Sequence, residues 1–509
     1  MSRLVTISAT AMSTAARLAA SALAVSVALA MLISACGVPE VPIADSSFTD
    51  VVTATPLPIE STPTPTITPT PEPTVDVGAA PEPTARPAPQ PGLSDTAVRV
   101  AVIADSDTGG VADDLFRDAW SGTLAWATAV NDAGGLGERQ VEVVTLDARL
   151  FNHEGVLRAV CQGDFFAIVG SQSLGDYEGA ELLGTEDCNL ADFVANVHGE
   201  RRADSPNTFV PNPILNEVRQ AGPTRWLIEQ FPEASQSVAL FHFDELRLAS
   251  ETERLREMLV GEGMQVVQID TDFEEGVSER ILRRWEEFEA EGLVWNSDPD
   301  RLIDVLREFD EIDASPTFVL CELGCYSEQF LRRGGAAVEG VYTWIPHRPF
   351  DSPDAPNELL TYRFWLKETA PELGWSEIGL ESWMAGRLFE EAFNRLLVVN
   401  PNALNRGELV AAANSIDAFS AGGILPLTDP GARMPTPCFA LMVVRDGRWV
   451  QEYPRPPRDL DCTEDNLYTL TSTRLLGRDV VADTSSATSV EADAVEAEDD
   501  LENPEEPAE

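Results

Sequence analysis

Two hydroxyl side chains stand where a predicted strand passes into a predicted helix, a position that suits an anion. The segment 170–173, Gly-Ser-Gln-Ser, follows the apolar run 165–169 and precedes a helix expected over 179–183. Backbone N–H groups are unpaired at a helix N-terminus and the helix dipole is positive there, so Ser171, Gln172 and Ser173 could bind a carboxylate. Capping of the helix by the two hydroxyls is the structural alternative, because capping and anion binding share one geometry.

Two acidic residues also follow predicted strands and could bind an ammonium group. Asp105 follows the strand 98–104, and Glu322 follows the strand 317–321. Because the chain is rich in Asp and Glu, a solvated surface acid is the plainer interpretation of either residue alone. Aromatic residues in or beside such turns could form the walls of a pocket, although they belong to a core as often as to a ligand site: Tyr177, Tyr326 and Trp344.

Alternating strands and helices must position these residues. Apolar runs predict strands at 98–104, 141–146, 165–170, 237–243, 264–269, 293–295, 317–321 and 338–343. Apolar residues at helical spacing predict helices at 116–131, 250–261, 277–290 and 299–309. This alternation is typical of parallel sheets covered on both faces, and the irregular segment 205–213 divides it into two Rossmann-like α/β lobes. Ligands bind beyond the carboxyl ends of the strands in such sheets, which two facing lobes bring to a common cleft.

Cys36 follows a segment that is typical of an export signal. Arg17 precedes the apolar run 18–33, which is too short and too rich in Ala and Ser for a membrane-spanning helix. The residues Ile33-Ser34-Ala35-Cys36 resemble the bacterial lipobox, which implies cleavage before Cys36 and attachment of lipid to its sulfur and amine. An ordinary signal peptide with a chance cysteine is the alternative. We expect residues 1–35 to be a lipoprotein signal peptide and the mature chain to be anchored to the bacterial cell membrane, outside the cytoplasm.

Both ends of the mature chain lack the residues that build a core. Residues 36–96 are rich in Pro and Thr, and since proline fixes φ and removes a donor, we expect a disordered stalk. Residues 476–509 are strongly acidic and predict a disordered tail. The whole chain has 85 acidic and 35 basic residues and a formal charge of −50, which excludes nucleic acid as a partner.

Six cysteines remain besides Cys36, and an even set in an exported chain favours disulfides. They allow 15 pairings. Proximity in sequence favours the pairs Cys161–Cys188, Cys321–Cys325 and Cys438–Cys462. A metal site is less well supported, because Cys321 and Cys325 lack a second such pair and the four histidines have no ligand spacing. We therefore expect three disulfides, no metal and no cofactor.

Four segments carry, in order, a resemblance to a known family. They are the strand 98–103, the helix from Trp120 that ends in Asn131-Asp-Ala-Gly-Gly-Leu-Gly137, the strand 141–147, and Ala167-Ile-Val-Gly-Ser171. Together they resemble the type I periplasmic binding proteins, and within these the leucine/isoleucine/valine-binding group of ABC-transporter solute receptors. The segment 131–137 is similar to that family's N-A-G-G-x-N-G helix end, and the 170–171 turn corresponds to its usual ligand loop. The likeness fades after Phe350.

The resemblance implies two lobes that are joined by a three-segment hinge and close on a ligand. The crossovers would lie near 210–214, 342–348 and 426–437. Lobe I would comprise 97–213 and 346–435, and lobe II would comprise 214–345 and 436–475. The resemblance also supports the Cys161–Cys188 pair, since family members often carry a disulfide there.

The function that the resemblance implies is capture of a small polar ligand, an amino acid or similar, for uptake by an ABC permease. A sensor or regulatory lipoprotein of the same fold, which binds a partner protein and does not transport, is the alternative, and the long stalk favours it. An enzyme is not expected, because no G-x-S-x-G or HExxH motif is present. The loop 105–110 lacks the family's T-G-P, which leaves the ligand open, and nothing in the sequence indicates an oligomeric state.

Overall fold

The computed structural model describes residues 90–107, 114–243, 249–271, 277–312, 314–399 and 404–471. These residues fall in one structural unit, Pro83–Glu509. The predicted signal peptide, the lipidation site Cys36, the acidic tail from 476 and the stalk before Gln90 lie outside the described ranges.

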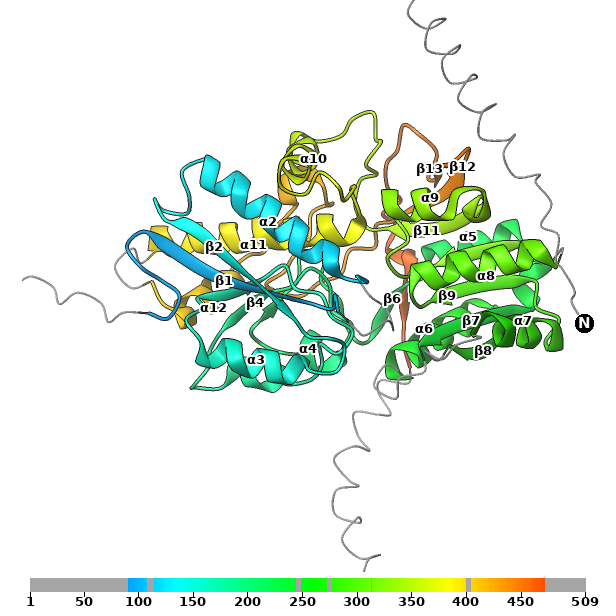
Figure 1. Cartoon of the computed structure of the whole chain (residues 1–509), viewed down its shortest axis with the longest axis horizontal. Coiled ribbons are helices and arrows are strands. Elements are labelled where there is room, and N and C mark those ends of the chain that lie inside the picture. The colour runs from blue at the N-terminus through cyan, green and yellow to red at the C-terminus, as the bar shows by residue number, and fades with distance from the viewer. Residues whose placement is uncertain are drawn as a thin grey trace, which may run out of the picture. The chain divides into compact units, whose positions relative to one another are not determined.

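Five parallel strands form the sheet of the first lobe, in the order β2-β1-β3-β4-β5 (Figure 1). From β1 to β5 their bounds are Ala97–Ala104, Gln140–Asp147, Ala167–Val169, Ala191–Phe193 and Thr208–Phe209. The helices of this lobe are α2 (Arg117–Asp132), α3 (His153–Gln162), α4 (Glu200–Ala203), α10 (Asn357–Thr369), α11 (Glu377–Val399) and α12 (Arg406–Asn414). Every residue of β3 and β4 is buried, as expected for strands of a sheet that helices cover on both faces.

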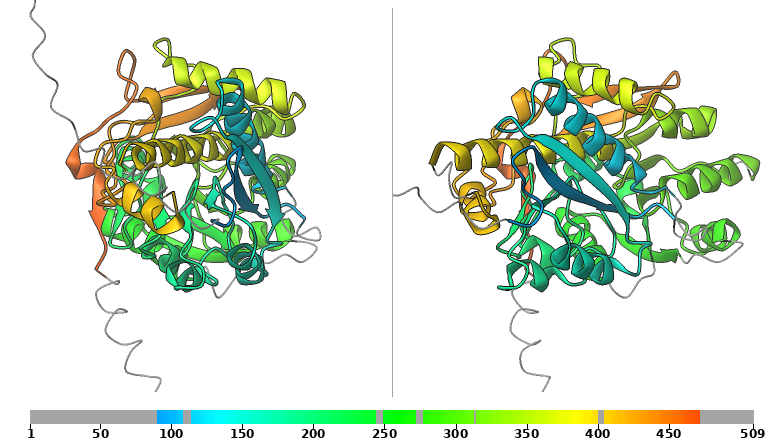
Figure 2. Two further views of the ribbon diagram at one scale, coloured as in Figure 1. Left: turned by 90° about the vertical axis from the view of Figure 1, so that its left-hand side faces the viewer. Right: turned by 60° about the vertical axis from the view of Figure 1, so that its left-hand side comes forward.

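Alternate side chains of β1 face different layers of helices. Val100 packs in one apolar cluster with Trp126 of α2 and Phe389 of α11, whereas Ile103 packs in another with Leu157 of α3. Helices α2 and α11 therefore cover one face of the sheet and α3 covers the other. The long helix α11, yellow in Figure 2, lies against α2 in both views.

Glycines allow α11 to approach α2 closely. A Cβ at Gly122 would lie 2.0 Å from the carbonyl oxygen of Gly379, and a Cβ at Gly386 would lie 2.3 Å from the indole of Trp126. A packed backbone carbonyl and a buried indole cannot move aside, so a larger residue at Gly122 or Gly386 would force the helices apart.

The second lobe contains a seven-stranded sheet in the order β13-β12-β11-β10-β9-β7-β8. From β7 to β13 the bounds are Val238–Phe243, Val266–Thr271, Gly292–Asn296, Phe318–Cys321, Val341–Ile345, Ala440–Arg445 and Arg448–Tyr453. Strands β7 to β11 are parallel, and β12 and β13 form an antiparallel hairpin. Asp446 and Gly447 form its turn, both with positive φ, as a two-residue hairpin loop requires.

Five helices cover this sheet: α5 (Gly222–Gln230), α6 (Ala249–Glu262), α7 (Val277–Glu287), α8 (Pro299–Glu311) and α9 (Glu328–Gly334). Leu240 of β7 shares an apolar cluster with Leu227 of α5 and Leu259 of α6. Phe241, the next residue, packs on the other side with Trp285 of α7 and Phe309 of α8. Strand alternation therefore again places one helical layer on each face.

The parallel strands of the two sheets follow the same order. In each sheet the second strand along the chain lies at the edge, next to the first strand. The chain leaves the first sheet after β5, enters the second, returns through α10 to α12, and ends in the hairpin of the second sheet. The strands β6 (Val218–Gln220) and β14 (Leu467–Thr469) pair separately. Short 3₁₀ helices occupy Ala180–Gly184, Ala234–Gln236, Gly335–Val338, Ala421–Gly423 and Glu464–Asn466.

Two strands of the first sheet were not expected from the sequence. β4 has three residues and β5 has two, which is too short to show an apolar pattern, and β5 lies inside the segment 205–213 that we predicted to be irregular. The three predicted disulfides are confirmed in the structure: Cys161–Cys188, Cys321–Cys325 and Cys438–Cys462.

Removal of the first disulfide should destabilise the fold. Cys161 and Cys188 are 27 residues apart, so replacing both with Ala should lower the free energy of unfolding by about 2–4 kcal/mol, because the unfolded chain gains freedom. Denaturant unfolding measures the loss. Replacing Cys321 and Cys325, only 4 residues apart, is the matched control and should cost less. Equal losses in the two variants would contradict the loop-length argument.

Candidate ligand-binding site

A cavity of about 190 Å³ lies at the carboxyl ends of strands from both sheets. On the side of the first lobe, Gln172 follows β3 and residues 195–199 follow β4. On the side of the second lobe, Asn296 ends β9, residues 322–324 follow β10, and Trp344 lies on β11. Since the strand order of each sheet reverses beside its first strand, the cavity occupies the position at which α/β sheets bind ligands.

Three glutamates from two separate parts of the chain line this cavity. Glu377 and Glu381 lie four residues apart on α11 and therefore on one face of the helix, and Glu322 follows β10. Glu322 accepts a hydrogen bond of 2.9 Å from the indole N–H of Trp344. Glu381 accepts one of 3.2 Å from the side-chain amide of Asn196. Among the described residues, none of the three carboxyls forms a salt bridge.

Burial makes the charged form of these glutamates unfavourable. It raises the pKa of Glu377 to about 8, and the negative charge of Glu322 contributes in the same direction. Burial also raises the pKa of Glu381 well above its usual range, with a further contribution from Glu377. The pKa of Glu322 is raised by burial as well, although the bond from Trp344 opposes the rise. The cavity wall thus concentrates carboxyls that have no ion-pair partner among the described residues and whose charged form is unfavourable.

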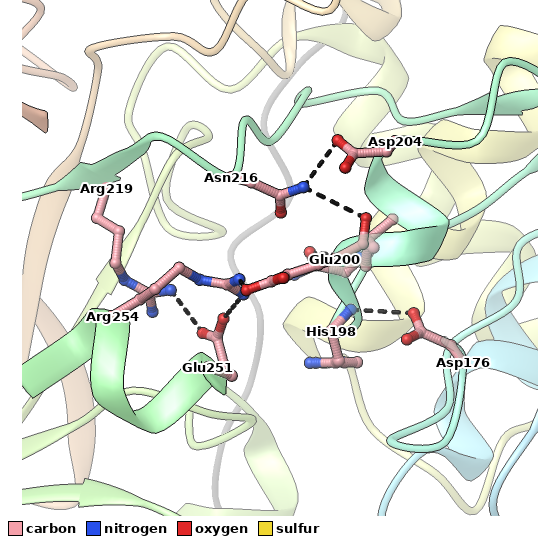
Figure 3. Close-up of polar contacts among 10 residues, drawn as sticks. Asp176, His198, Glu200, Asp204, Asn216, Arg219, Glu251 and Arg254 are labelled. Carbon is pink, nitrogen blue, oxygen red and sulfur yellow. Dashed lines mark hydrogen bonds and ion pairs between the residues drawn. The ribbon is translucent and has the colours of Figure 1, made fainter. Parts of the chain in front are cut away.

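A chain of ion pairs, which joins residues of both lobes, also contributes to the lining of this cavity (Figure 3). Arg219 of β6 and Arg254 of α6 bind opposite oxygens of Glu251, at 2.6 and 2.5 Å. Arg254 also pairs with Glu200 of α4, so its guanidinium connects the two lobes. Burial alone would raise the pKa of Glu251, but the two arginines outweigh it and lower the pKa to about 2. Both arginines are therefore already committed to carboxylates.

Two amide oxygens at the cavity wall have no donor. Gln172 is only 2% exposed, and its Nε2 lies 3.3 Å from Nε2 of His198, while its Oε1 is buried and unpaired among the described residues. Oδ1 of Asn212, which also lines the cavity, is likewise buried and unpaired within the part of the chain that the structure describes. A buried acceptor without a partner costs about 1–3 kcal/mol, so a donor on a ligand would be favourable here.

Three of the eight residues that we predicted to contact ligand line this cavity: Gln172, Glu322 and Trp344. The other five do not: Asp105, Ser171, Ser173, Tyr177 and Tyr326.

Ser171 and Asp105 stabilise the turns behind the cavity. Ser171 Oγ accepts from the backbone N–H of Ile103 at 2.8 Å, and Ser173 is fully buried. The carboxylate of Asp105 accepts from the backbone N–H groups of Leu150 and Leu174, which holds two loops together. The predicted helix is a five-residue 3₁₀ helix that begins at Ala180, so it does not present an α-helix N-terminus to these hydroxyls.

The two tyrosines outside the cavity lie in packed regions. Tyr326 is 1% exposed and stacks at 5.5 Å on Phe350, whose N–H it accepts through its hydroxyl oxygen. Tyr326 is therefore part of the core, which was the alternative to a ligand contact for an aromatic residue near a turn. Tyr177 packs under Gly199, where a Cβ would lie 2.3 Å from the Cβ of Tyr177.

The sequence interpretation missed Glu377, Glu381, Arg219 and Arg254. A usable signal exists for α11, where Glu381 stands among buried residues such as Leu380 and Trp383 on an otherwise apolar stretch. A buried acid on such a stretch requires a partner or a ligand. The arginines give no comparable signal, because neither stands in an apolar stretch of the sequence.

A fully buried ion pair supports the loop 195–199. Arg202 of α4 forms two hydrogen bonds of 2.8 Å with Asp192 of β4 and a third of 2.7 Å with Nε2 of His153. Burial lowers the pKa of His153 to about 3, so its neutral ring accepts from Arg202 and donates from Nδ1 to the carbonyl of Glu178 at 3.0 Å. Here each buried charge has its partners, unlike the glutamates of the cavity wall.

The described ranges contain neither a metal-binding cluster nor a membrane-spanning helix. No three His, Cys, Asp or Glu side chains gather there in a way that could hold a metal ion. No helix there is long and apolar enough to span a bilayer.

The lobes, the strand order and the shared cavity define a two-lobed binding protein. The chain belongs to the periplasmic binding protein family, whose sequence profile matches residues 97–448. No curated protein sequence matches the chain. The predicted fold class and family are thereby confirmed.

Solved structures share the fold at low sequence identity. A fatty acid ABC transporter substrate-binding protein from Thermomonospora curvata is 13% identical, with a TM-score of 0.62 over 74% of this chain and 95% of that one. The leucine binding protein LivK from Thermotoga maritima is 16% identical, with a TM-score of 0.57 over 72% and 99%. LivJ from Streptococcus pneumoniae, in complex with isoleucine, is 12% identical, with a TM-score of 0.55 over 70% and 100%. These identities show the fold alone.

Loss of the buried arginine should be strongly destabilising. Arg202→Ala would leave Asp192 charged and unpaired in the core, so we expect the free energy of unfolding to fall by about 3–5 kcal/mol. Denaturant unfolding measures it. The control is Arg158→Ala, which breaks an exposed pair with Glu154 and should cost less than about 1 kcal/mol. Similar losses from both variants would show that the buried pair adds nothing specific.

Stability should fall with rising pH because of Glu377. Its raised pKa means that the folded state keeps a proton which the unfolded chain loses above about pH 4.5. The stability from that proton is fully present below pH 4.5 and is lost as the pH rises through about 8.

Glu377→Gln cannot ionise, so its melting temperature should equal that of the wild type at low pH and exceed it by about 2 °C or more at high pH. Thermal melts across this range measure the difference. Glu154→Gln changes an exposed residue and is the control. The difference in melting temperature between this variant and the wild type should not increase with pH. A difference between Glu377→Gln and the wild type that stays constant with pH would contradict the argument.

Proposed function

We propose that the protein captures a small polar solute between its two lobes, outside the cytoplasm, and delivers it to an ABC permease. The observation that carries this proposal is the cavity that both lobes line at the carboxyl ends of their strands. A solute bound there contacts both halves and therefore favours the state in which they lie together. The family to which the chain belongs supports a binding role without chemistry.

Export and membrane attachment complete the proposal. The signal-like segment before Cys36 supports export, and the three disulfides fit an oxidising compartment. Lipid on Cys36 would hold the protein at the cell membrane near a permease, and the residues between Cys36 and the fold would act as a tether.

The likeness to solved structures leaves the ligand class open. They include a fatty acid ABC transporter substrate-binding protein, a leucine binding protein and a solute binding protein in complex with benzoate, so that one fold serves three chemically different ligands. The class of ligand that this protein binds therefore has to be inferred from the residues that line its own cavity.

A metabolite panel tests the proposal. Residues 90–478 contain every described residue, and a bound solute at 100 times its Kd should stabilise this fragment by about 2.7 kcal/mol. Thermal melts with amino acids, amines, carboxylic acids and sugars would detect the shift. If no metabolite shifts the melting temperature and the protein instead captures an envelope protein, the regulatory alternative replaces transport.

A further inference from the structure

We propose that the solute is a small organic cation that carries a primary ammonium or amidinium group and no carboxylate. This inference rests on the proposed function, since it concerns the same cavity. It departs from the amino acid that the sequence suggested.

The charged residues of the cavity wall leave an excess of acid. Four carboxyls and two guanidiniums line it. Both arginines are occupied by ion pairs, one of them shared with Glu200. The glutamates that remain are Glu322 from the second lobe and Glu377 and Glu381 from the first. A cation placed among them would supply the ion-pair partner that no described residue provides, and it would favour the charged form of these carboxyls.

The wall of the cavity also carries hydrogen-bond acceptors that have no partner among the described residues. Gln172, 98% buried, and Asn212 each present a carbonyl oxygen without a donor among the described residues. Two neighbouring donors are already used, because the amide of Asn196 binds Glu381 and the indole N–H of Trp344 binds Glu322. Ammonium and amidinium groups donate several hydrogen bonds and accept none, which matches this set.

A carboxylate has no comparable place in the cavity. The hydroxyl of Ser171 is bound to the backbone of β1, and Ser173 lies outside the lining. A ligand carboxylate would instead face the three glutamates and would be repelled. The ring of Trp344, held on the same wall, adds an aromatic face of the kind that attracts cations.

Pairs of compounds that differ in charge test the proposal. Isothermal titration of the full-length protein in detergent would compare benzamidine with benzoate, and 3-methylbutylamine with leucine, which is the same amine bearing a carboxylate. 1,4-Diaminobutane would be tested alongside. The titrations would use 0.15 M salt, because the net charge of −50 attracts cations to the whole surface and salt screens that attraction beyond about 8 Å.

We expect at least one amine or amidine to bind and its carboxylate-bearing counterpart not to bind. Glu377→Gln and Glu381→Gln should each weaken binding about tenfold, the loss of roughly one well-placed charge interaction. Both should stay folded, because burial already favours an uncharged side chain at these positions. Glu154→Gln, an exposed residue of α3, is the matched control and should bind as the wild type does.

Other outcomes separate this inference from the proposed function. If leucine or benzoate binds and the matching amine or amidine does not, the inference that the ligand is a cation is wrong, but the proposed function as a solute receptor still holds. Binding of an amine that is equally strong in both glutamine variants would place it on the acidic surface and overturn the inference. Absence of binding by every amine and amidine would overturn the inference too. The proposed function would be overturned only if no compound of the metabolite panel shifted the melting temperature.

Discussion

The close contact between α2 and α11 decides where the acidic wall of the cavity lies. Gly122 allows the backbone of α2 to reach the carbonyl of Gly379, and that glycine stands between Glu377 and Glu381. The same contact that completes the core of the first lobe therefore fixes the position of both carboxyls. Since the α2–α11 layer also packs on the sheet, any change that separates the two helices would move the wall relative to Gln172 at the end of β3.

Two kinds of ionisable group lie inside this lobe, and their surroundings distinguish them. Arg202 and Asp192 form a bidentate pair with further bonds to His153 and Thr208, so nothing remains for a ligand to satisfy. Glu377 and Glu381 have no such compensation, and burial raises the pKa of each. Ionisable groups with shifted pKa values are typical of functional sites, because a bound ligand can supply the interactions that the folded protein alone does not.

The sequence predicted the fold better than the site. Alternating strands and helices and the spacing of the cysteines are local signals, and the structure contains the sheets and disulfides that they indicate. β4 and β5 are too short to show a pattern. The direction of a hydroxyl such as that of Ser171 depends on tertiary packing, and Glu377 meets Gln172 only because α11 returns from 205 residues further along the chain.

The arrangement of charges also couples binding to the approach of the lobes. Glu322 belongs to the second lobe and Glu377 to the first, and repulsion between their ionised forms, which contributes to the raised pKa of Glu377, opposes the position that the ion pair of Arg254 with Glu200 favours. A neutral or anionic solute would leave that repulsion in place. A cation between the two carboxyls turns it into two attractions, so the gain appears only when both lobes are in contact with the solute. Differential affinity of this kind is what a hinged receptor needs, because a ligand shifts a conformational equilibrium only as far as it prefers one state.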